Sequence, residues 1–159
     1  MKVSVLAVGK VKESYLKNAL AEYIKRLSKF TKLEIIEVAD EKCAETLSMG
    51  EMAIVKAKEG ERLLNKIPKD AYLITLEING RALTSEEFAG FINLNQVKGH
   101  GHLCFIIGGS LGLSEEITRK SDYALSFSKM TFPHQLMRIF LLEQVYRAFK
   151  INGNEPYHK

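Results

Sequence analysis

A glycine-rich turn is the first feature of this sequence that could do chemistry. Gly108-Gly109-Ser110-Leu111-Gly112 follows an apolar run and precedes an acidic helix start at Glu115. Glycine adopts positive φ and lets the backbone approach a ligand closely, which is how many folds bind nucleotides with main-chain groups. The turn is not a Walker A loop, because no Gly-Lys-Ser/Thr follows at the required spacing, and it lacks the first-strand placement of the dinucleotide fingerprint. It therefore indicates a ligand site without naming the ligand.

The same turn also matches Gly-x-Ser-x-Gly, the pattern around the nucleophile of α/β-hydrolases, with Ser110 at its centre. Asp122 and His134 follow in the chain order that this fold uses for its catalytic triad. The chain is short for that fold, however, and Asp122 lies close to the serine in sequence. A turn role for Ser110 is favoured, and the hydrolase remains an alternative.

Histidine and cysteine residues show no pattern typical of a metal site. His100 and His102 have no cysteine or carboxylate partner nearby, which favours a solvated loop over a ligand pair. Cys43 and Cys104 lie far apart and each lacks a second ligand, so we expect ordinary thiols rather than a zinc site or a disulfide. The sequence predicts no metal.

The elements that must position the glycine turn alternate along the chain. Short apolar runs predict five strands, at Val3 to Val8, Leu33 to Val38, Ala71 to Ile78, Leu103 to Gly109 and Tyr123 to Ser128. Segments rich in helix formers lie between them, at Tyr15 to Phe30, Glu51 to Asn65, Glu86 to Asn95 and Glu115 to Lys120. Thr84 and Glu87 have the spacing of a capping box before the third of these helices. This order predicts one α/β domain over residues 1–159, with a mainly parallel sheet and helices on both faces.

The last predicted helix, about Phe132 to Ile151, is apolar around most of its circumference. One sheet cannot bury all of this surface, so we expect a second covering surface, most simply the same helix of a second copy. The alternative is a central helix that its own chain surrounds.

Composition is that of an ordinary globular protein, with 46% hydrophobic and 26% charged residues and a net charge of +4. The basic excess is concentrated after Phe127, where five Lys and Arg residues (Lys129, Arg138, Arg147, Lys150 and Lys159) face two glutamates. Any contact with phosphate is expected first in this segment. No apolar run is long enough for a signal-peptide core or a membrane span, which predicts a cytoplasmic protein that does not enter a membrane.

The C-terminal third carries a more specific pattern. FSKMTFPHQLMR (Phe127 to Arg138), LLEQVYRAFKI (Leu141 to Ile151) and EPYHK (Glu155 to Lys159) resemble the C-terminal signature of the RlmH family of the SPOUT superfamily, and VGK near the start and GGSLGL agree with that family too. The resemblance implies a parallel sheet with a C-terminal trefoil knot and a homodimer. It also implies a methyltransferase that uses S-adenosyl-L-methionine to methylate N3 of a pseudouridine in large-subunit (23S) ribosomal RNA on the assembled 70S ribosome.

The resemblance also assigns a cofactor site. It implies that S-adenosylmethionine is bound by Leu76, Gly108, Phe127, Ser128, Lys129, Met130, Thr131 and Phe132. Positioning does much of the catalysis in such a reaction, and no metal is required. Met130 and Phe132 are alternatively ordinary core residues, and a structural role at the helix start is favoured for His134.

The tail supplies the candidate catalytic residues, which in the family reach toward the active site of the dimer. His158 can exchange a proton, Tyr157 can stack on a base, and Arg147 or Lys159 can hold phosphate or favour the imide anion. The sequence departs from the family where Asn154 takes the place of a glycine, and asparagine tolerates the left-handed backbone that the turn requires. A frayed tail and a non-catalytic RNA-binding module are the competing interpretations.

Overall fold

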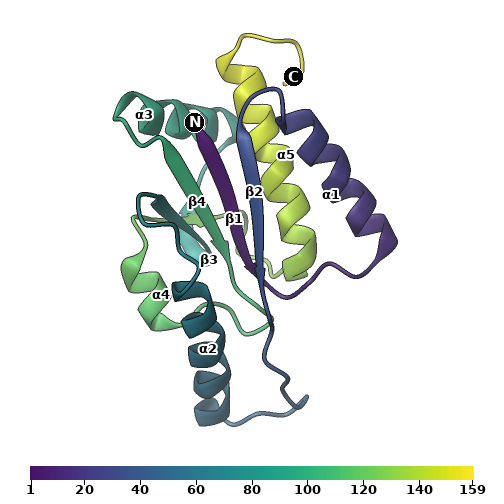
Figure 1. The fold of residues 1–159 in the computed structure, drawn as a ribbon, viewed down its shortest axis with the longest axis vertical. Coiled ribbons are helices and arrows are strands. Elements are labelled where there is room, and N and C mark those ends of the chain that lie inside the picture. The colour runs from purple at the N-terminus through teal and green to yellow at the C-terminus, as the bar shows by residue number, and fades with distance from the viewer.

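The computed structural model describes all of residues 1–159. Its elements are β1 (Lys2–Val8), α1 (Ser14–Leu27), β2 (Lys32–Val38), α2 (Met49–Leu64), β3 (Tyr72–Ala82), α3 (Ser85–Val97), β4 (His102–Ile107), α4 (Glu115–Lys120), β5 (Tyr123–Ser126) and α5 (His134–Asn152) (Figure 1). All five predicted strands and all five predicted helices are present, with boundaries that differ by a few residues. The largest difference is in β3, which extends to Ala82 instead of ending at Ile78.

The strands form one sheet in the order β2-β1-β4-β3-β5, and every neighbouring pair is parallel. Val5 of the first strand lies beside Ile35 on one side and Phe105 on the other. Parallel neighbours need crossover connections, and the helices supply them. The predicted α/β class is therefore confirmed.

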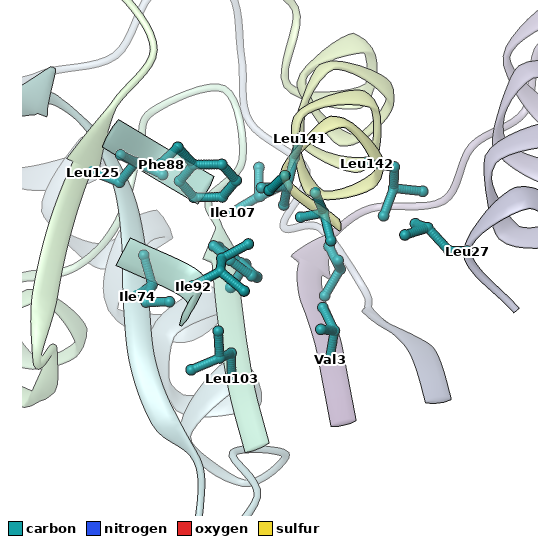
Figure 2. Packing of buried hydrophobic residues seen from close by; sticks show 14 of the residues in the cluster. Val3, Leu27, Ile74, Phe88, Ile92, Leu103, Ile107, Leu125, Leu141 and Leu142 are labelled. Atoms are coloured by element: carbon teal, nitrogen blue, oxygen red, sulfur yellow. The ribbon is translucent and has the colours of Figure 1, made fainter. Parts of the chain in front are cut away.

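Alternation of side chains along the strands divides the core into two layers. Val3, Val5 and Ala7 face one side, where they pack with buried residues of α1, α3 and α5 such as Leu27, Ile92 and Leu142 (Figure 2). Residues Leu6 and Val8 face the other side and pack with Leu63 of α2 and Ile117 of α4. Helices therefore cover both faces of the sheet, as the sequence predicts.

Helix α5 is largely surrounded by its own chain. Its fully buried residues include Leu141, Leu142, Val145 and Ala148, which pack on the sheet, while α1 and α3 flank the helix on either side. The alternative of a central helix therefore accounts for most of its apolar surface. An apolar remainder is exposed near its N-terminal end, where Phe140 lies in edge contact with Phe132 at 5.8 Å between ring centroids.

The chain crosses itself closely where β5 passes β3. Leu125 pairs first with Leu76 and then with Arg81, so the intervening residues of β3 bulge out of the sheet. A Cβ atom on Gly80 would lie 2.8 Å from the backbone carbonyl of Ala124, which only glycine allows. The Ser126 hydroxyl donates to the Ile78 carbonyl at 2.9 Å in the same crossing. A threaded chain would cross in this way, and the trefoil knot stays a prediction.

Candidate functional site

A cavity of about 630 Å³ opens beyond the carboxyl ends of β3, β4 and β5. Ligands of open α/β sheets bind at this end of the strands. Seven of the residues that the sequence assigns to the cofactor lie in its wall: Leu76, Gly108, Phe127, Ser128, Met130, Thr131 and Phe132. Lys129 is the one assigned residue that does not line it. The fold thus brings together three segments that are far apart in the chain.

The glycine turn forms one wall of the cavity, and its shape depends on Gly108. A Cβ atom there would lie 2.7 Å from the backbone of Gly112, too close for any other residue without rearrangement. Gly112 itself has a φ of 85° and donates its N–H to the Gly109 carbonyl at 3.0 Å. This wall is therefore made of backbone, as the sequence predicts.

The loop from Phe127 to Phe132 forms the opposite wall. Ser128 stabilises it, because its hydroxyl accepts a hydrogen bond from the Met130 N–H at 3.0 Å. Met130 is 72% exposed and Phe132 is 36% exposed, so the alternative that both are core residues is wrong. They lie at the rim of the cavity and are free to pack on a ligand.

Only two of the lining residues are ionisable, Glu77 and His134. His134 is the first residue of α5, which confirms its predicted place at the helix start, and it also faces the cavity. Burial, and next the neighbouring Arg138 guanidinium, lower the pKa of His134 below the ordinary imidazole value. The imidazole is therefore neutral at neutral pH.

Arg138 links the N-terminal end of α5 to the ends of β1 and β2. Its side chain is fully buried and donates to the carbonyls of Val8 and Gly9 at 3.0 and 2.6 Å and to the Glu37 carboxylate at 2.6 Å. The expectation that basic residues of the C-terminal segment contact phosphate is wrong for Arg138, because no solvent reaches it. The sequence predicted a cation on the surface, whereas in the fold Arg138 is buried and connects α5 to β1 and β2 through hydrogen bonds.

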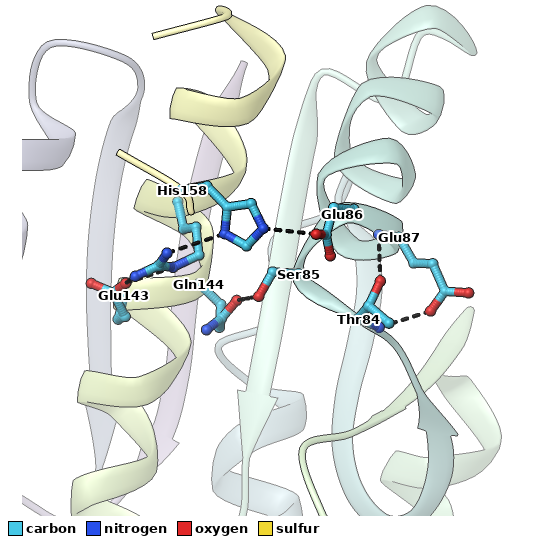
Figure 3. Close-up of polar contacts among 8 residues, drawn as sticks. Thr84, Ser85, Glu86, Glu87, Glu143, Gln144 and His158 are labelled. Carbon is cyan, nitrogen blue, oxygen red and sulfur yellow. Dashed lines mark hydrogen bonds and ion pairs between the residues drawn. The ribbon is translucent and has the colours of Figure 1, made fainter. Parts of the chain in front are cut away.

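The C-terminal tail folds back on the far end of α5 and makes a polar cluster (Figure 3). Glu143 is its centre: one carboxylate oxygen accepts from Arg147 Nε and Nη2 at 2.9 and 2.7 Å, and the other accepts from the Tyr157 hydroxyl at 2.9 Å. The Arg147 guanidinium also lies over the Tyr157 ring, 4.7 Å from its centroid. Burial, and next the Glu143 carboxylate, raise the pKa of Tyr157, so its phenol stays a donor.

His158 lies between a cation and an anion in this cluster. Its Nδ1 is 3.1 Å from Arg147 Nη1 and its Nε2 is 2.7 Å from a Glu86 carboxylate oxygen. Because arginine has only donors, Nδ1 must accept, and Nε2 then carries the proton that is donated to Glu86. Asn154 has a φ of 52°, which confirms that asparagine takes the left-handed position before the tail. The tail is thus fixed by side chains and is not frayed.

The tail cluster and the cavity lie at opposite ends of α5. His134 and Arg147 are separated by more than three helical turns, which is about 20 Å along the helix. Figure 1 shows the C-terminus at the top end of α5, whereas the helix begins at the other end. Within one chain, the structure therefore does not bring Arg147, Tyr157, His158 and Lys159 to the cavity.

The hydrolase alternative has no support in the geometry. Asp122 accepts the Leu73 backbone N–H at 2.7 Å, and no hydrogen bond joins Ser110, Asp122 and His134. In the stretch with the histidine pair, Lys98, Gly99 and Gly101 are exposed, while His100 and His102 are half-buried and are bonded to Asn95 and Ser4, both at 2.7 Å.

The remaining residues that were singled out make no further site. Cys43 is exposed, Cys104 is buried, and both are free thiols. No group of three or more His, Cys, Asp or Glu side chains is placed to hold a metal ion. No helix is long and apolar enough to cross a membrane.

Three residues of these sites were missed by sequence reasoning: Glu77, Glu86 and Glu143. A signal existed for two of them. Glu77 directly follows Leu76 near the carboxyl end of a buried strand, where polar residues reach ligands, and Glu143 precedes Arg147 by one helical turn. No local signal marks Glu86, whose partner is 72 positions away in the chain.

A cavity walled by a glycine turn and a C-terminal loop, at the edge of a parallel sheet, defines the class of SPOUT-type methyltransferases. The family described as "Predicted SPOUT methyltransferase" matches residues 1–158. Proteins named "Ribosomal RNA large subunit methyltransferase H" from Clostridioides difficile (strain 630) and Bifidobacterium adolescentis are 57% and 58% identical to this chain, each over the full length of both proteins. The chain therefore belongs to the RlmH family of SPOUT methyltransferases, as its C-terminal motifs predict.

One solved structure supports the fold at low sequence similarity. A probable methylase family protein from Haemophilus influenzae Rd KW20 superimposes with a TM-score of 0.55 and 13% identity, over 99% of this chain and 70% of that protein. The likeness concerns the arrangement of the elements alone.

Proposed function

We propose that this protein is an S-adenosylmethionine-dependent methyltransferase that methylates N3 of a pseudouridine in large-subunit ribosomal RNA on the assembled 70S ribosome. The observation that carries the proposal is the meeting of Leu76, Gly108 and the 127–132 loop around one cavity. The relatives at 57% and 58% identity are named as methyltransferases of large-subunit ribosomal RNA, which supports this RNA as the substrate.

The cavity suits S-adenosylmethionine in size and character. Its volume of about 630 Å³ falls within the range of about 300 to 1,000 Å³ that is usual for small-molecule sites, and half of its eighteen lining residues are hydrophobic. The backbone of the glycine turn offers hydrogen-bonding groups to the adenine and ribose, while Leu76, Met130 and Phe132 offer apolar contact. When bound, the cofactor supplies a methyl group on a sulfonium, which needs neither a metal nor a covalent enzyme intermediate.

The protein's own contribution is positioning and proton handling at the target base. Tyr157 presents a ring that can stack on the base, and Arg147 and Lys159 are the cations that can hold phosphate or favour the anion of the imide. His158 is the candidate group for proton exchange with the base. Because methyl transfer requires an in-line approach of a deprotonated nitrogen, alignment of the base with the donor is the main catalytic task.

The separation of tail and cavity supports a homodimer in which each tail serves the partner's cavity. The tail is about 20 Å from the cavity of its own chain, measured along α5. The exposed apolar side chains Met130, Phe132 and Phe140 lie near the cavity rim and offer a surface for the second copy. One catalytic unit would then combine the cavity of one chain with the tail of the other.

The ribosome, rather than free RNA, is the proposed partner. A net charge of +4 is small for a protein that binds naked RNA tightly. Docking on the assembled particle would supply the remaining contacts. The expected location is the cytoplasm, where the ribosomes are.

Methyl transfer from labelled S-adenosylmethionine to 70S ribosomes, isolated subunits and free RNA tests the proposal directly, with the modified nucleoside mapped. We expect label at a pseudouridine of the large-subunit RNA, and only on 70S particles. Efficient methylation of an isolated hairpin would contradict the requirement for the ribosome. If calorimetry shows cofactor binding but no methyl group is transferred, the substrate is a different one. If S-adenosylmethionine does not bind, the non-catalytic RNA-binding module is favoured.

A further inference from the structure

Glu77 is the only carboxylate in the wall of the cavity, and the structure holds it in place. The hydroxyl of Thr75, a fully buried residue, donates to the Glu77 carboxylate at 2.6 Å. Ser121 holds Thr75 in turn: its hydroxyl accepts the Thr75 backbone N–H at 3.3 Å and lies 2.8 Å from the Thr75 hydroxyl oxygen, to which it can donate. Neutral hydroxyls, rather than a cation, thus orient this acid.

No positive charge offsets Glu77 in the cavity. None of the lining residues is a lysine or an arginine, and Glu77 takes part in none of the ion pairs of the structure. The other ionisable group of the wall, His134, has a pKa lowered by burial and by Arg138 and is neutral at neutral pH. The cavity therefore has a net negative charge in partly apolar surroundings, where charges interact more strongly than in water.

The methyl donor and its product differ in charge. S-adenosylmethionine has a sulfonium, an ammonium and a carboxylate, which sum to one positive charge. Its product, S-adenosylhomocysteine, has a neutral thioether in place of the sulfonium and no net charge. A carboxylate that acts on the sulfur position distinguishes the two molecules, whereas a carboxylate that binds the ammonium or the ribose, which both molecules share, does not.

We propose that Glu77 makes this cavity selective for the positively charged methyl donor over its neutral thioether product. The inference rests on the proposed function, since it takes S-adenosylmethionine as the ligand of the cavity. Glu77 favours binding before the methyl group is transferred and loses that attraction once the sulfonium has become a thioether. The group that attracts the donor would thereby also favour release of the product.

Calorimetric titration of donor and product into the wild type, Glu77→Gln and Glu77→Asp tests the proposal without any need for turnover. We expect Glu77→Gln to weaken donor binding about tenfold and product binding less than about twofold, since it removes the charge and keeps the shape. Glu77→Asp keeps the charge and should retain the preference for the donor. Sinefungin, which has a charged amine where the donor has its methyl-sulfonium centre, should follow the donor.

Glu115→Gln is the matched control, because Glu115 is an exposed acid on α4 that pairs with Arg119 outside the cavity. It should change neither affinity. A measurement on the wild type alone keeps the test valid if Glu77→Gln does not fold: raising the salt concentration should weaken donor binding more than product binding.

Equal weakening of donor and product in Glu77→Gln would overturn the proposal, because Glu77 would then contact a group that both molecules share. Unchanged affinities for both molecules would overturn it as well. In either case the proposed function stands, since the wild type still binds the donor. A wild type that binds neither molecule would refute the proposed function together with this inference.

Discussion

Arg138 of α5 lies 2.6 Å from Glu37 of β2, a residue 101 positions earlier in the chain. The guanidinium also holds the carbonyls of Val8 and Gly9, and Glu37 accepts the Val11 N–H at 3.2 Å. These hydrogen bonds of Arg138, called the Arg138 brace below, connect the end of β1, β2 and the start of α5. Arg138 lies one helical turn after His134, which lines the cavity, so the Arg138 brace fixes the end of α5 that carries His134.

Replacing Arg138 with methionine should therefore destabilise the protein. The change leaves two buried carbonyls without a donor and leaves Glu37 with only the Val11 N–H, so we expect a loss of about 2 to 3 kcal/mol in the free energy of unfolding. Urea denaturation followed by circular dichroism measures it. Arg119→Met removes an exposed pair with Glu115 and should change the stability by less than about 1 kcal/mol. Equal effects of the two substitutions would contradict the brace.

The crossing at Gly80 should not tolerate a side chain. A Cβ atom there would meet the backbone of Ala124 and Leu125 at 2.8 Å, so Gly80→Ala should destabilise the protein by about 1 to 3 kcal/mol. Gly90→Ala is the matched control within α3, because nothing lies within 4 Å of the added methyl group. That variant should gain about 0.5 to 1 kcal/mol from helix propensity. Thermal unfolding of both variants measures these changes in stability. A Gly80→Ala variant as stable as the wild type would contradict the close crossing of β3 and β5.

Donor binding should weaken in acid because of His134. The folded protein holds this imidazole neutral, through burial first and then Arg138, with Asp40 as the opposing negative group. Affinity for a cationic donor is therefore fully present above the ordinary imidazole pKa of 6.5 and is lost as the pH falls through the lowered pKa of His134. Titrations between pH 7.5 and 5 should show a loss of about three- to tenfold that His134→Gln lacks. The same acid loss in both proteins would exclude His134 as its cause.

Glu143 should affect turnover rather than donor binding. Glu143→Gln removes the charge that orients Arg147 and Tyr157, so we expect kcat on 70S ribosomes to fall about tenfold. The dissociation constant of the donor should stay unchanged, because the tail residues are proposed to act on the target base and none of them is part of the cavity wall. Glu22→Gln, which removes an exposed pair with Arg26, should leave both quantities unchanged. A weakened donor affinity in Glu143→Gln would place this cluster in the cofactor site instead.

Local sequence determined the secondary structure because its signals act over a few residues. Apolar runs indicated all five strands, and Thr84 with Glu87 indicated the capping box that the structure contains. Asn154 was likewise predicted from its own backbone preference. The C-terminal motifs gave the family, and with it the residues around the cavity, although their roles stay predictions.

Only the tertiary structure decided which distant residues meet. The strand order β2-β1-β4-β3-β5, the burial of Arg138 and the contact of His158 with Glu86 depend on packing between segments that no short-range pattern links. The sequence alone cannot separate a surface cation from a buried one, because the charge of Arg138 is the same in either place and only its neighbours differ. For the same reason, the negative charge of the cavity became visible only when the fold placed Glu77 in a wall without lysine or arginine.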